Sequence, residues 1–386
     1  MDKFLEIRKK YPVTEKCIYL DTATSGLIST ESYNKIRTHL DKRFHDGMDI
    51  PWVNSCWENA DKFRERVAEM VNADADEIFF EENCSAILNV FSSGIDFLNG
   101  SNIVTSNLSF PSTPYAWMHQ AKRGIEVRFA KAVNGMIGFE KIVELVDEKT
   151  AAISLCYVEN TSGFRHDLDK IGKFCQERGI LLVIDATQCI AALKIDVKKM
   201  HIDFLAVSSY KWLNNLFGIG FGYVSKNLIN RINQSYVGWV GNVDRQDHSE
   251  YKIDLAKGAQ RFEMGGLNWT GLGGMDASIK TYMKMGKDDV EKYILELTDY
   301  IYQKVSETSQ IELVGPFPKE NRSGISYIIF PKSWKLNDDI LYRNNIRAHI
   351  ASENTMRISC HFYNNKEDID GLFDFFKACE KNEIIR

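Results

Sequence analysis

A lysine and an aspartate, each placed after an apolar run, are the residues of this sequence best suited to chemistry. The run 204–207 leads to Lys211, and the run 180–184 ends at Asp185. Such runs predict buried strands, so an amine and a carboxylate both leave strand ends. An amine can form a Schiff base with an aldehyde, and a carboxylate can hold a pyridine nitrogen protonated. Together they suggest a pyridoxal phosphate site, although a single strand-end lysine is more often a surface residue.

A helix start supplies a candidate phosphate site. The segment 83–89 has Asn83 at the N-cap position, followed by Cys84 and Ser85 in the first turn. Unpaired amides at the positive end of a helix dipole suit an anion. Ordinary capping by Asn83 is the structural alternative.

Four further side chains near strand ends could hold other parts of the same cofactor. Ser208 and Tyr210 precede the lysine and carry hydroxyls for the phosphate. Phe110 follows a predicted strand, where its ring could stack on a flat heteroaromatic group, although phenylalanine is more often a core residue. Gln188, three residues after Asp185, could donate its amide to the phenolic oxygen.

An arginine near the C-terminus is the candidate substrate clamp. The segment 356–362 alternates apolar and polar residues, which predicts a strand with one apolar face. Arg357 points to the polar face with Ser359 and His361, whereas Cys360 lies on the apolar face. A guanidinium offers a carboxylate two parallel hydrogen bonds, so Arg357 is suited to a substrate carboxylate. A surface salt bridge is the alternative.

Short apolar runs alternate with segments of helical period, the pattern of a mostly parallel sheet covered by helices. We predict an α/β fold with seven strands, at 77–80, 102–106, 126–130, 151–158, 180–185, 204–208 and 220–224. Helices are predicted at 59–71 and 167–178.

The regular alternation of short apolar runs and helical segments does not continue after Gly265, and the pattern there predicts a smaller α+β domain. Its predicted elements are a long helical stretch at 273–307, strands at 326–330 and 356–362, and a helix at 366–377. We therefore expect a large cofactor-binding domain at 17–260 and a small domain formed by 1–16 and 261–386.

Composition narrows the class of protein. The 386 residues carry a net charge of −5 with both signs mixed along the chain, which gives no basic stripe for nucleic acid. The eight cysteines include no CxxC pair, which argues against disulfides and a zinc site. The N-terminus lacks the apolar segment of a signal peptide, and no stretch approaches the roughly 18 apolar residues of a membrane span. We expect a cytoplasmic protein that acts on a small molecule, without a membrane or nucleic-acid partner.

The glycines at 218–222 could instead indicate a dinucleotide fold. They do not follow the first strand, and they lack the full GxGxxG spacing before a helix. This interpretation is therefore weak.

Taken together, these segments resemble the class V aminotransferase and cysteine desulfurase family of fold-type I pyridoxal phosphate enzymes, and in particular its isopenicillin N epimerase-like branch. The resemblance runs nearly end to end, from 18–21 to 357–370. It is carried by an Asp-x-x-Gln motif at 185–188, a lysine motif at 208–211, and an Arg-Phe-Glu-x-Gly-x-x-Asn motif at 261–268.

By this resemblance, Lys211 binds the cofactor aldehyde and shuttles a proton, and Asp185 pairs with the pyridine nitrogen. Phe110 stacks on the ring where many relatives carry His, and Gln188 contacts the phenolate oxygen. The residues implied for the phosphate are Cys84, Ser85 and Ser208, with Tyr210 in place of a common histidine, and those implied for the substrate carboxylate are Asn160 and Arg357.

The resemblance also implies a homodimer, because the family's sites lie at a dimer interface. Gly266 and Leu267 stand where relatives have Thr-Pro, which removes a hydroxyl that relatives contribute to the phosphate of the neighbouring subunit. Backbone amides at Gly266 are expected to substitute for it.

Desulfurases of this family carry a nucleophilic cysteine on a mobile loop shortly before the arginine. The corresponding stretch, 347–355, has no cysteine. The strand alternation places Cys360 on the face opposite Arg357. The resemblance therefore disfavours a desulfurase that forms a persulfide on the protein.

The resemblance implies an α-amino acid substrate, an external aldimine, and removal of the Cα proton by Lys211. Return of the proton to the cofactor gives transamination, return to the opposite face gives epimerisation, and loss of a β-substituent gives elimination, as in cysteine or cystine lyases. We place an aminotransferase first, an elimination lyase second and an epimerase third. The intact Lys211, Asp185 and Arg357 disfavour a scaffold or sensor that only binds the cofactor.

Overall fold

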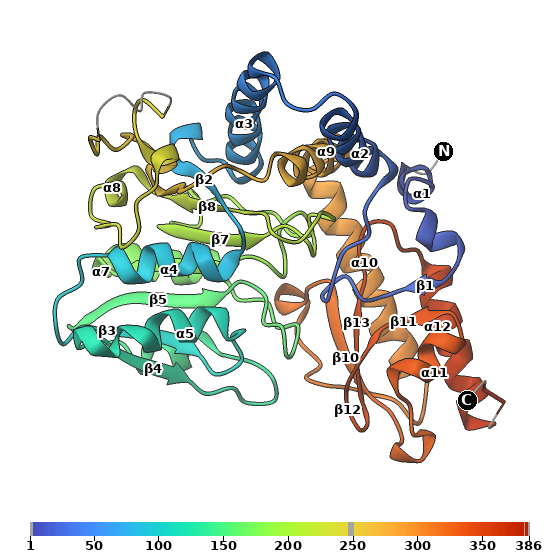
Figure 1. Cartoon of the computed structure of the whole chain (residues 1–386). Coiled ribbons are helices and arrows are strands. Elements are labelled where there is room, and N and C mark those ends of the chain that lie inside the picture. The colour runs from blue at the N-terminus through green and yellow to red at the C-terminus, as the bar shows by residue number, and fades with distance from the viewer. Residues whose placement is uncertain (1–2, 246–250, 382, 385–386) are drawn as a thin grey trace.

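The computed structural model describes residues 3–245, 251–381 and 383–384, and it has a seven-stranded central sheet (Figure 1). The strands of this sheet are β2 (Ile78–Glu81), β3 (Asn102–Ser106), β4 (Glu126–Ala130), β5 (Thr150–Cys156), β6 (Leu181–Asp185), β7 (Phe204–Ser208) and β8 (Gly220–Val224). The strand order is β2-β8-β7-β6-β5-β3-β4. β8 runs antiparallel to both of its neighbours, and the other pairings are parallel. The predicted α/β class and the seven predicted strands are confirmed.

Helices cover both faces of this sheet because neighbouring strand residues point to opposite sides. In β6, Ile184 belongs to one core cluster and Val183 to another. The helices α4 (Cys84–Gly94) and α5 (Ser112–Met118) contribute to the Val183 cluster, and α7 (Leu168–Arg178) contributes to the Ile184 cluster. In Figure 1, α4 and α5 accordingly lie in front of the strands.

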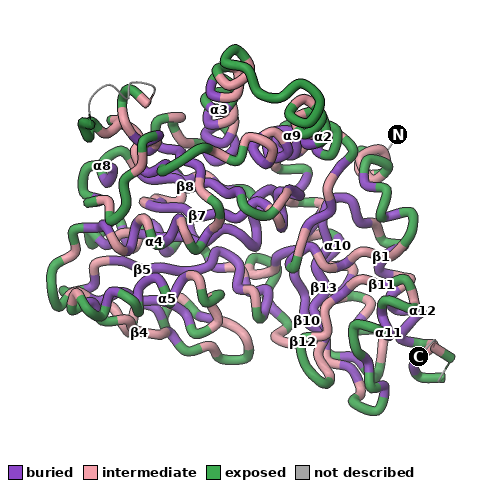
Figure 2. The backbone as a smooth tube through the Cα atoms, viewed as in Figure 1, coloured by how far each residue is buried: buried purple, intermediate pink, exposed green. Residues whose placement is uncertain are grey.

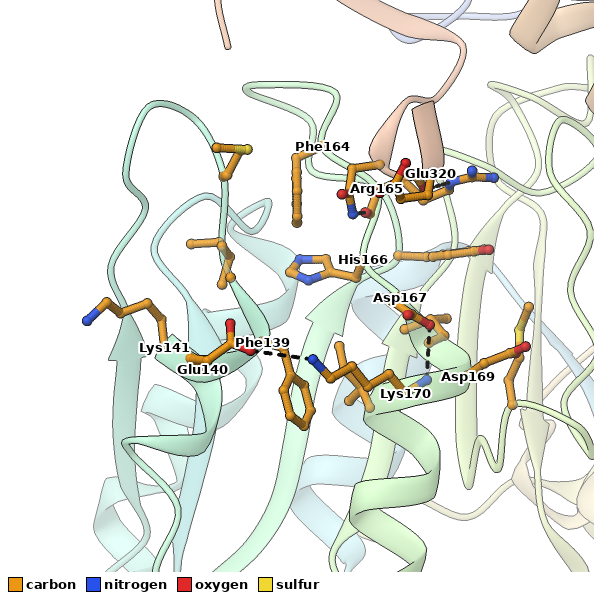
Figure 3. Close-up of a pocket in the computed structure, with 18 of the residues that line it drawn as sticks. Phe139, Glu140, Lys141, Phe164, Arg165, His166, Asp167, Asp169, Lys170 and Glu320 are labelled. Atoms are coloured by element: carbon orange, nitrogen blue, oxygen red, sulfur yellow. Dashed lines mark hydrogen bonds and ion pairs between the residues drawn. The ribbon is translucent and has the colours of Figure 1, made fainter. Parts of the chain in front are cut away.

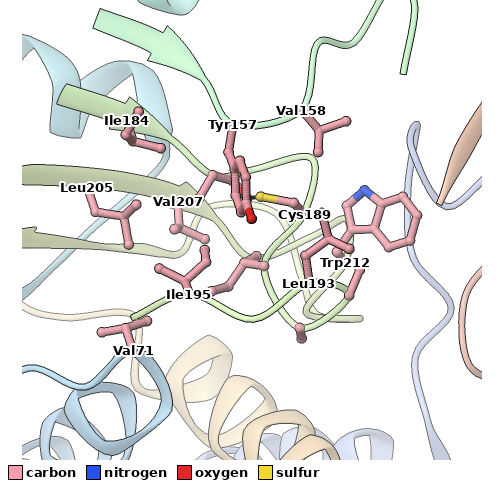
Figure 4. Close-up of a cluster of buried hydrophobic side chains, with 14 of the residues drawn as sticks. Val71, Tyr157, Val158, Ile184, Cys189, Leu193, Ile195, Leu205, Val207 and Trp212 are labelled. Atoms are coloured by element: carbon pink, nitrogen blue, oxygen red, sulfur yellow. Dashed lines mark hydrogen bonds between the residues drawn. The ribbon is translucent and has the colours of Figure 1, made fainter. Parts of the chain in front are cut away.

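The core lies along the sheet. Figure 2 shows buried backbone along the central strands and exposed backbone at the connection between α2 (Thr30–His45) and α3 (Ile50–Val71). Figure 4 shows one part of the core, where Tyr157 lies beside Cys189 and Val207 lies near Ile195. A sheet buried on both faces explains why its strands read as continuous apolar runs.

The parallel strands carry their carboxyl ends to the same edge of the sheet. Cys156 at the end of β5 pairs with Asp185 at the end of β6, and Asp185 pairs with Ala206 in β7. The carboxyl ends of three neighbouring strands therefore lie together, and Cys156, Asp185 and Ser208 all line the cavity at this edge. Ligands commonly bind at this edge of a parallel sheet.

The C-terminal part contains a second sheet with the strand order β12-β13-β10-β9. Its strands are β9 (Glu312–Leu313), β10 (Ile325–Ile329), β12 (His349–Ser352) and β13 (Thr355–Ser359), and its helices are α9 (Trp269–Met285), α10 (Lys287–Ser306), α11 (Asp338–Arg343) and α12 (Lys366–Glu380). The other elements of the chain are α1 (Lys3–Arg8), α2 (Thr30–His45), α3 (Ile50–Val71), α6 (Phe139–Val143), α8 (Lys226–Ile229), β1 (Ile18–Tyr19) and β11 (Ile346–Arg347). β1 pairs in parallel with β11, and Leu20 belongs to the core cluster of the C-terminal strands. We propose that residues 17–260 form the large domain and that residues 1–16 and 261–386 form the small one. The pairing of β1 with β11 connects the two domains near residue 17.

The long helical stretch predicted at 273–307 is two helices. Gly286, between α9 and α10, has φ +86°, outside the helical region, so the chain turns there. The strand predicted at 356–362 is also shorter, because β13 ends at Ser359 and turns follow.

The glycines of β8 have a packing role. A Cβ added to Gly220 would lie 2.2 Å from the carbonyl oxygen of Val207, and one added to Gly222 would lie 2.3 Å from the ring of Phe79. These glycines allow the close approach of neighbouring strands, and they do not form a turn between a strand and a helix.

A buried ion pair ties the Arg-Phe-Glu segment to the sheet. Arg64 of α3 donates to Glu263 at 2.6 Å, and both side chains are almost fully buried. Glu263 also accepts from the backbone N–H of Phe80 at 2.9 Å, and Arg64 donates to the Ile78 carbonyl at 3.0 Å. Glu263 therefore has a structural function in this motif.

Replacing Glu263 by alanine should destabilise the fold by about 3–5 kcal/mol, because the buried Arg64 charge loses its buried partner and keeps only the half-exposed Asp61. Urea unfolding measures this change. Asp96→Ala, which breaks an exposed pair with Arg231, is the control and should cost less than about 1 kcal/mol. Equal losses in both variants would contradict the structural function of Glu263.

Among the described residues, no helix combines the length and the apolar character needed to cross a bilayer. The same residues contain no cluster of three or more side chains suited to a metal ion.

Candidate functional site

A cavity of about 390 Å³ lies at the carboxyl edge of the parallel strands. It is lined by Asn83, Cys84, Ser85, Phe110, Ser112, Cys156, Val158, Asp185, Thr187, Gln188, Ser208, Tyr210 and Lys211. The structure thus brings together eight of the eleven site residues predicted from the sequence. The other three are Asn160, Arg357 and Gly266.

The amine of Lys211 is buried in this cavity. The residue is 6% exposed, and its Nζ lies 5.2 Å from the centre of the Phe110 ring. Within the described parts of the chain, Nζ makes no hydrogen bond or ion pair. Burial lowers the pKa of Lys211, and the nearby charge of Asp185 partly offsets this effect. A buried amine with a lowered pKa is a suitable nucleophile and base.

The Asp185 carboxylate is held in place by its own turn. Its Oδ1 accepts from the backbone N–H of Thr187 at 2.8 Å, and its Oδ2 lies 3.9 Å from Cys156 Sγ. Burial, together with the charge of Asp185, raises the pKa of the Cys84 and Cys156 thiols. Both thiols therefore stay protonated near neutral pH and are poor nucleophiles.

The other end of the cavity suits an anion. Asn83 caps α4 by accepting from the Ala86 N–H at 3.0 Å, as the capping alternative proposed. The Ser85 and Ser112 hydroxyls lie 2.6 Å apart beside this helix start. Ser208 Oγ accepts from the Cys84 N–H at 2.8 Å. Three hydroxyls and a helix N-terminus thus meet at one place.

Two aromatic rings form a wall of the cavity. Phe110 is 41% exposed, which is unusual for a core phenylalanine, and its ring faces Lys211 Nζ. Tyr210 stacks on Phe217 with ring centres 4.1 Å apart. The exposed face of Phe110 is available for a flat ligand.

Gln188 links this cavity to the second group of predicted residues. Its Nε2 donates to Asn160 Oδ1 at 2.7 Å and to the Ala23 carbonyl at 3.1 Å. Its Oε1 accepts from Trp212 Nε1 at 3.0 Å. Both amide hydrogens are therefore in use, so donation to a cofactor oxygen requires one of these bonds to open.

Arg357 lies beside Asn160 and is almost fully buried. Its Nη1 donates to Asn160 Oδ1 at 2.9 Å. Its Nη2 donates to Asp21 Oδ1 at 3.1 Å and to Thr24 Oγ1. The predicted strand alternation is confirmed here, because Met356, Ile358 and Cys360 belong to the opposite, apolar core cluster.

Sequence reasoning missed several residues of this region, namely Ser112, Thr187, Asp21 and Thr24. Asp21 and Thr24 reach the site through contacts distant in sequence. Ser112, only two positions after Phe110, could have been found from its place in the same strand-end loop.

Gly266 lies outside this cavity, in an exposed segment. A Cβ added to it would meet no atom within 4 Å. Gly266 is thus exposed to solvent, with no neighbouring atom of the described part of this chain above its Cα.

The stretch before Arg357 is a hairpin rather than a loop. β12 pairs in antiparallel fashion with β13, and the turn between them lies at Glu353 and Asn354. Neither strand nor turn contains a cysteine. Cys360 is fully buried, and burial raises its pKa.

The donor set fits pyridoxal phosphate. The free amine of Lys211 can take the aldehyde, Asp185 Oδ2 can accept from a ring nitrogen, and the helix start at Cys84 can take the phosphate. Phe110 offers a face for the ring.

A larger hollow of about 840 Å³ lies around His166 (Figure 3). Several of its charged side chains are already paired: Lys170 contacts Glu140, as Figure 3 shows, and Arg165 contacts Glu291. Its composition therefore indicates no particular ligand.

Comparison with known sequences gives matches over nearly the whole chain. The sequence model of the family described as aminotransferase class V matches residues 18–372. A probable cysteine desulfurase of Methanothermobacter thermautotrophicus is 27% identical over 391 residues, which cover 95% of this chain and 96% of that protein. An uncharacterized aminotransferase of Bacillus subtilis is 22% identical, with 97% of each chain covered.

Solved structures share the fold. The cystine C–S lyase C-DES, in complex with its reaction product cysteine persulfide, matches with a TM-score of 0.86 at 18% identity over 95% of this chain and 98% of that chain. An apo cysteine desulfurase from Thermococcus onnurineus matches with a TM-score of 0.86 at 23% identity, with 98% of each chain covered.

Proposed function

Because this chain belongs to the aminotransferase class V family, whose members are pyridoxal-phosphate-dependent enzymes, we propose that it acts on an α-amino acid in the cavity around Lys211. The observation that carries this proposal is the buried Lys211 amine, unpaired in the described part of the chain, in one cavity with the Asp185 carboxylate. The predicted fold-type I architecture agrees with the fold of the known structures.

The proposed tasks of the residues follow from their places. Bound pyridoxal phosphate supplies an aldehyde and an electron-accepting ring. Lys211 holds the cofactor and moves the proton at the substrate Cα. Asp185 would keep the ring nitrogen protonated, Phe110 would stack on the ring, and Gln188 would contact its phenolic oxygen once its bond to Ala23 or Asn160 opens. Cys84, Ser85, Ser208, Tyr210 and Ser112 surround the phosphate, and Asn160 and Arg357 bind the substrate carboxylate.

We propose elimination of a β-substituent, with a cysteine-like amino acid as the substrate, as the reaction. The curated relative from Methanothermobacter is named a probable cysteine desulfurase, and C-DES is named a cystine C–S lyase. The hairpin before Arg357 lacks the cysteine that would receive sulfur. Lys211 removes the Cα proton, and the sulfur group leaves Cβ with the C–S bonding pair. Hydrolysis then gives pyruvate and ammonia.

Transamination, placed first from the sequence alone, is the second candidate. The Bacillus relative named an uncharacterized aminotransferase supports it. Both reactions begin with removal of the same proton by Lys211, so the residues described do not separate them. Epimerisation is the third candidate.

A panel of L- and D-amino acids, including cystine, tests this order. Elimination releases pyruvate and ammonia without an added 2-oxo acid, whereas transamination requires one. Turnover that depends on a 2-oxo acid would contradict our choice and favour the aminotransferase.

Replacing Arg357 by lysine should raise KM by about 10–100-fold with a smaller change in kcat, because one ammonium cannot reproduce the paired donors of a guanidinium. Steady-state kinetics measure this change, and the visible absorption of the bound cofactor should be retained. Loss of the cofactor instead would assign Arg357 a structural role.

We also propose a homodimer with the sites at its interface. Large apolar side chains are exposed at the end of α2 and the start of α3, where Phe44 is 83% and Ile50 is 73% exposed. Trp239 packs against Trp57 of α3, so the segment around it, with exposed Tyr236, lies beside the same helix. Such clustering is typical of protein interfaces. In this dimer, the amides of Gly266 would reach the phosphate of the neighbouring subunit.

Replacing Phe44 by aspartate should convert the dimer to a monomer in sedimentation experiments, because a charge would be buried at the interface. Leu98→Asp, at a 79% exposed leucine on the connection before β3, is the control and should leave the dimer unchanged. A wild-type monomer at micromolar concentration would contradict the proposal.

We further propose that the enzyme works in the cytoplasm on a small molecule. The mixed surface charge, with a net value of −5, supports this proposal and gives no basic stripe for nucleic acid.

A further inference from the structure

Asp21 occupies the donors of Arg357 that a substrate carboxylate needs. Asp21 Oδ1 accepts from Nη2 at 3.1 Å, and Thr24 Oγ1 accepts from the same nitrogen. Nη2 has two hydrogens, so both are in use. Asn160 takes one hydrogen of Nη1.

The remaining donors cannot form a fork. The Nε–H of Arg357 is buried and has no acceptor among the described residues. The other donor that the hydrogen bonds to Asn160, Asp21 and Thr24 leave unused is the second hydrogen of Nη1, and the Tyr327 hydroxyl lies beside the same guanidinium. A bidentate contact needs two neighbouring, parallel N–H groups, which the guanidinium offers only when Nη2 is released.

The position of Asp21 is fixed by its backbone. Asp21 bridges to Ser359 beside β13, and its carbonyl accepts from the amides of Thr24 and Ser25 at 3.1 Å each. The same turn continues to Gly26, whose N–H donates to the Tyr210 carbonyl at 2.9 Å. The segment 21–26 therefore runs from Arg357 to the residue before Lys211, along the space where the substrate is proposed to bind.

Charge explains why Asp21 and a substrate cannot share Arg357. The Arg357 and Asp21 side chains are 6% and 19% exposed, so the pair is largely shielded from water. Asp21 neutralises a guanidinium that would otherwise be a buried, unpaired charge, which is costly. A second carboxylate on the same guanidinium would leave a net negative charge and repel Asp21.

We propose that Asp21 is a further residue of the substrate site and competes internally for Arg357, so that the substrate carboxylate must displace it from Nη2. This inference rests on the proposed function of Arg357 as the carboxylate clamp. Asp21 sets the affinity for substrate, because the free enzyme spends most of its time with the clamp occupied.

Calorimetric titration of the holoenzyme with propionate, a carboxylate without an amine, tests this competition. Asp21→Ala should bind propionate about tenfold more tightly than the wild type, if the clamp is free about one-tenth of the time. Asp21→Asn should show a smaller gain, because its amide oxygen still accepts a weaker, neutral hydrogen bond. The KM of the amino acid substrate should fall in the same order. Asp96→Asn, in an exposed pair with Arg231, is the matched control and should change nothing.

Arg357→Lys in the same titration separates the two hypotheses. If Arg357→Lys weakens propionate binding but both Asp21 variants bind it as the wild type does or more weakly, the competition is overturned and the clamp remains. If Arg357→Lys binds propionate as tightly as the wild type, the clamp itself is wrong. Thermal unfolding checks that Asp21→Ala is folded. If Asp21→Ala does not fold, the test rests on Asp21→Asn, which keeps the shape of the aspartate side chain. Undetectable binding of propionate to every protein would also overturn the competition.

Discussion

Replacing Lys211 by alanine should abolish turnover of every amino acid while leaving the protein folded. Lys211 is proposed both to hold the cofactor and to move the Cα proton, and a positioned acid or base alone contributes about 10²–10⁴-fold. The Nζ atom makes no hydrogen bond or ion pair with the described residues, so its removal breaks no bond of that kind. Turnover by the purified variant and its visible spectrum, compared with the wild type, measure both effects.

The control for this variant is Lys226→Ala. Lys226 is half exposed and pairs with Asp74 on the surface, far from the cavity lining. It should retain full activity and the cofactor absorption. A Lys211→Ala protein with more than a small fraction of wild-type turnover would contradict the assignment of the lysine.

Replacing Asp185 by asparagine should reduce kcat by about 10²–10³-fold, the loss seen when one preorganised electrostatic partner is removed. The amide has nearly the same shape, and its oxygen can still accept from the Thr187 N–H. It carries no charge, however, so it cannot keep a pyridine nitrogen protonated. Single-turnover measurement of Cα–H exchange in a deuterated solvent follows the affected proton directly.

Asp203→Asn is the matched control. Asp203 is another shielded aspartate beside the sheet, where burial raises its pKa to about 6 and where it accepts from the Leu182 N–H at 2.8 Å. It precedes β7, at the opposite edge from Lys211. We expect altered stability with little change in kcat. An equal loss of kcat in both variants would mean that Asp185 acts through the fold alone.

Local patterns predicted the fold well because this sheet is buried on both faces. The runs 180–184 and 204–207 are apolar throughout, and each is followed by a polar residue that lines the cavity, Asp185 or Ser208. Parallel strands bring their carboxyl ends together, so strand position alone predicted that Asp185 and Lys211 meet.

Contacts between distant segments could not be predicted in this way. Gln188 was expected to face the cofactor, yet its amide is shared with Ala23 and Asn160. Asp21 reaches Arg357 only because β1 pairs with β11 and carries the N-terminal segment to β13. No local periodicity encodes such a pairing.

Helix ends and turns were also harder to locate. Glycine within a helical pattern can be tolerated or can end the helix, and at Gly286 the positive φ ends it. The stretch 347–355 has the length of a loop, but its residues pair as the strands of a hairpin. The sequence alone shows that this stretch contains no cysteine. Its folding as a hairpin does not change the consequence, which is that the stretch offers no thiol to receive sulfur from a substrate.

The most direct test of the central claim is to reduce the holoenzyme with borohydride, digest it, and find the modified peptide by mass spectrometry. Our account predicts a phosphopyridoxyl group on Lys211 and on no other lysine in significant yield. Modification of a different lysine, or none in a protein that retains activity, would contradict it.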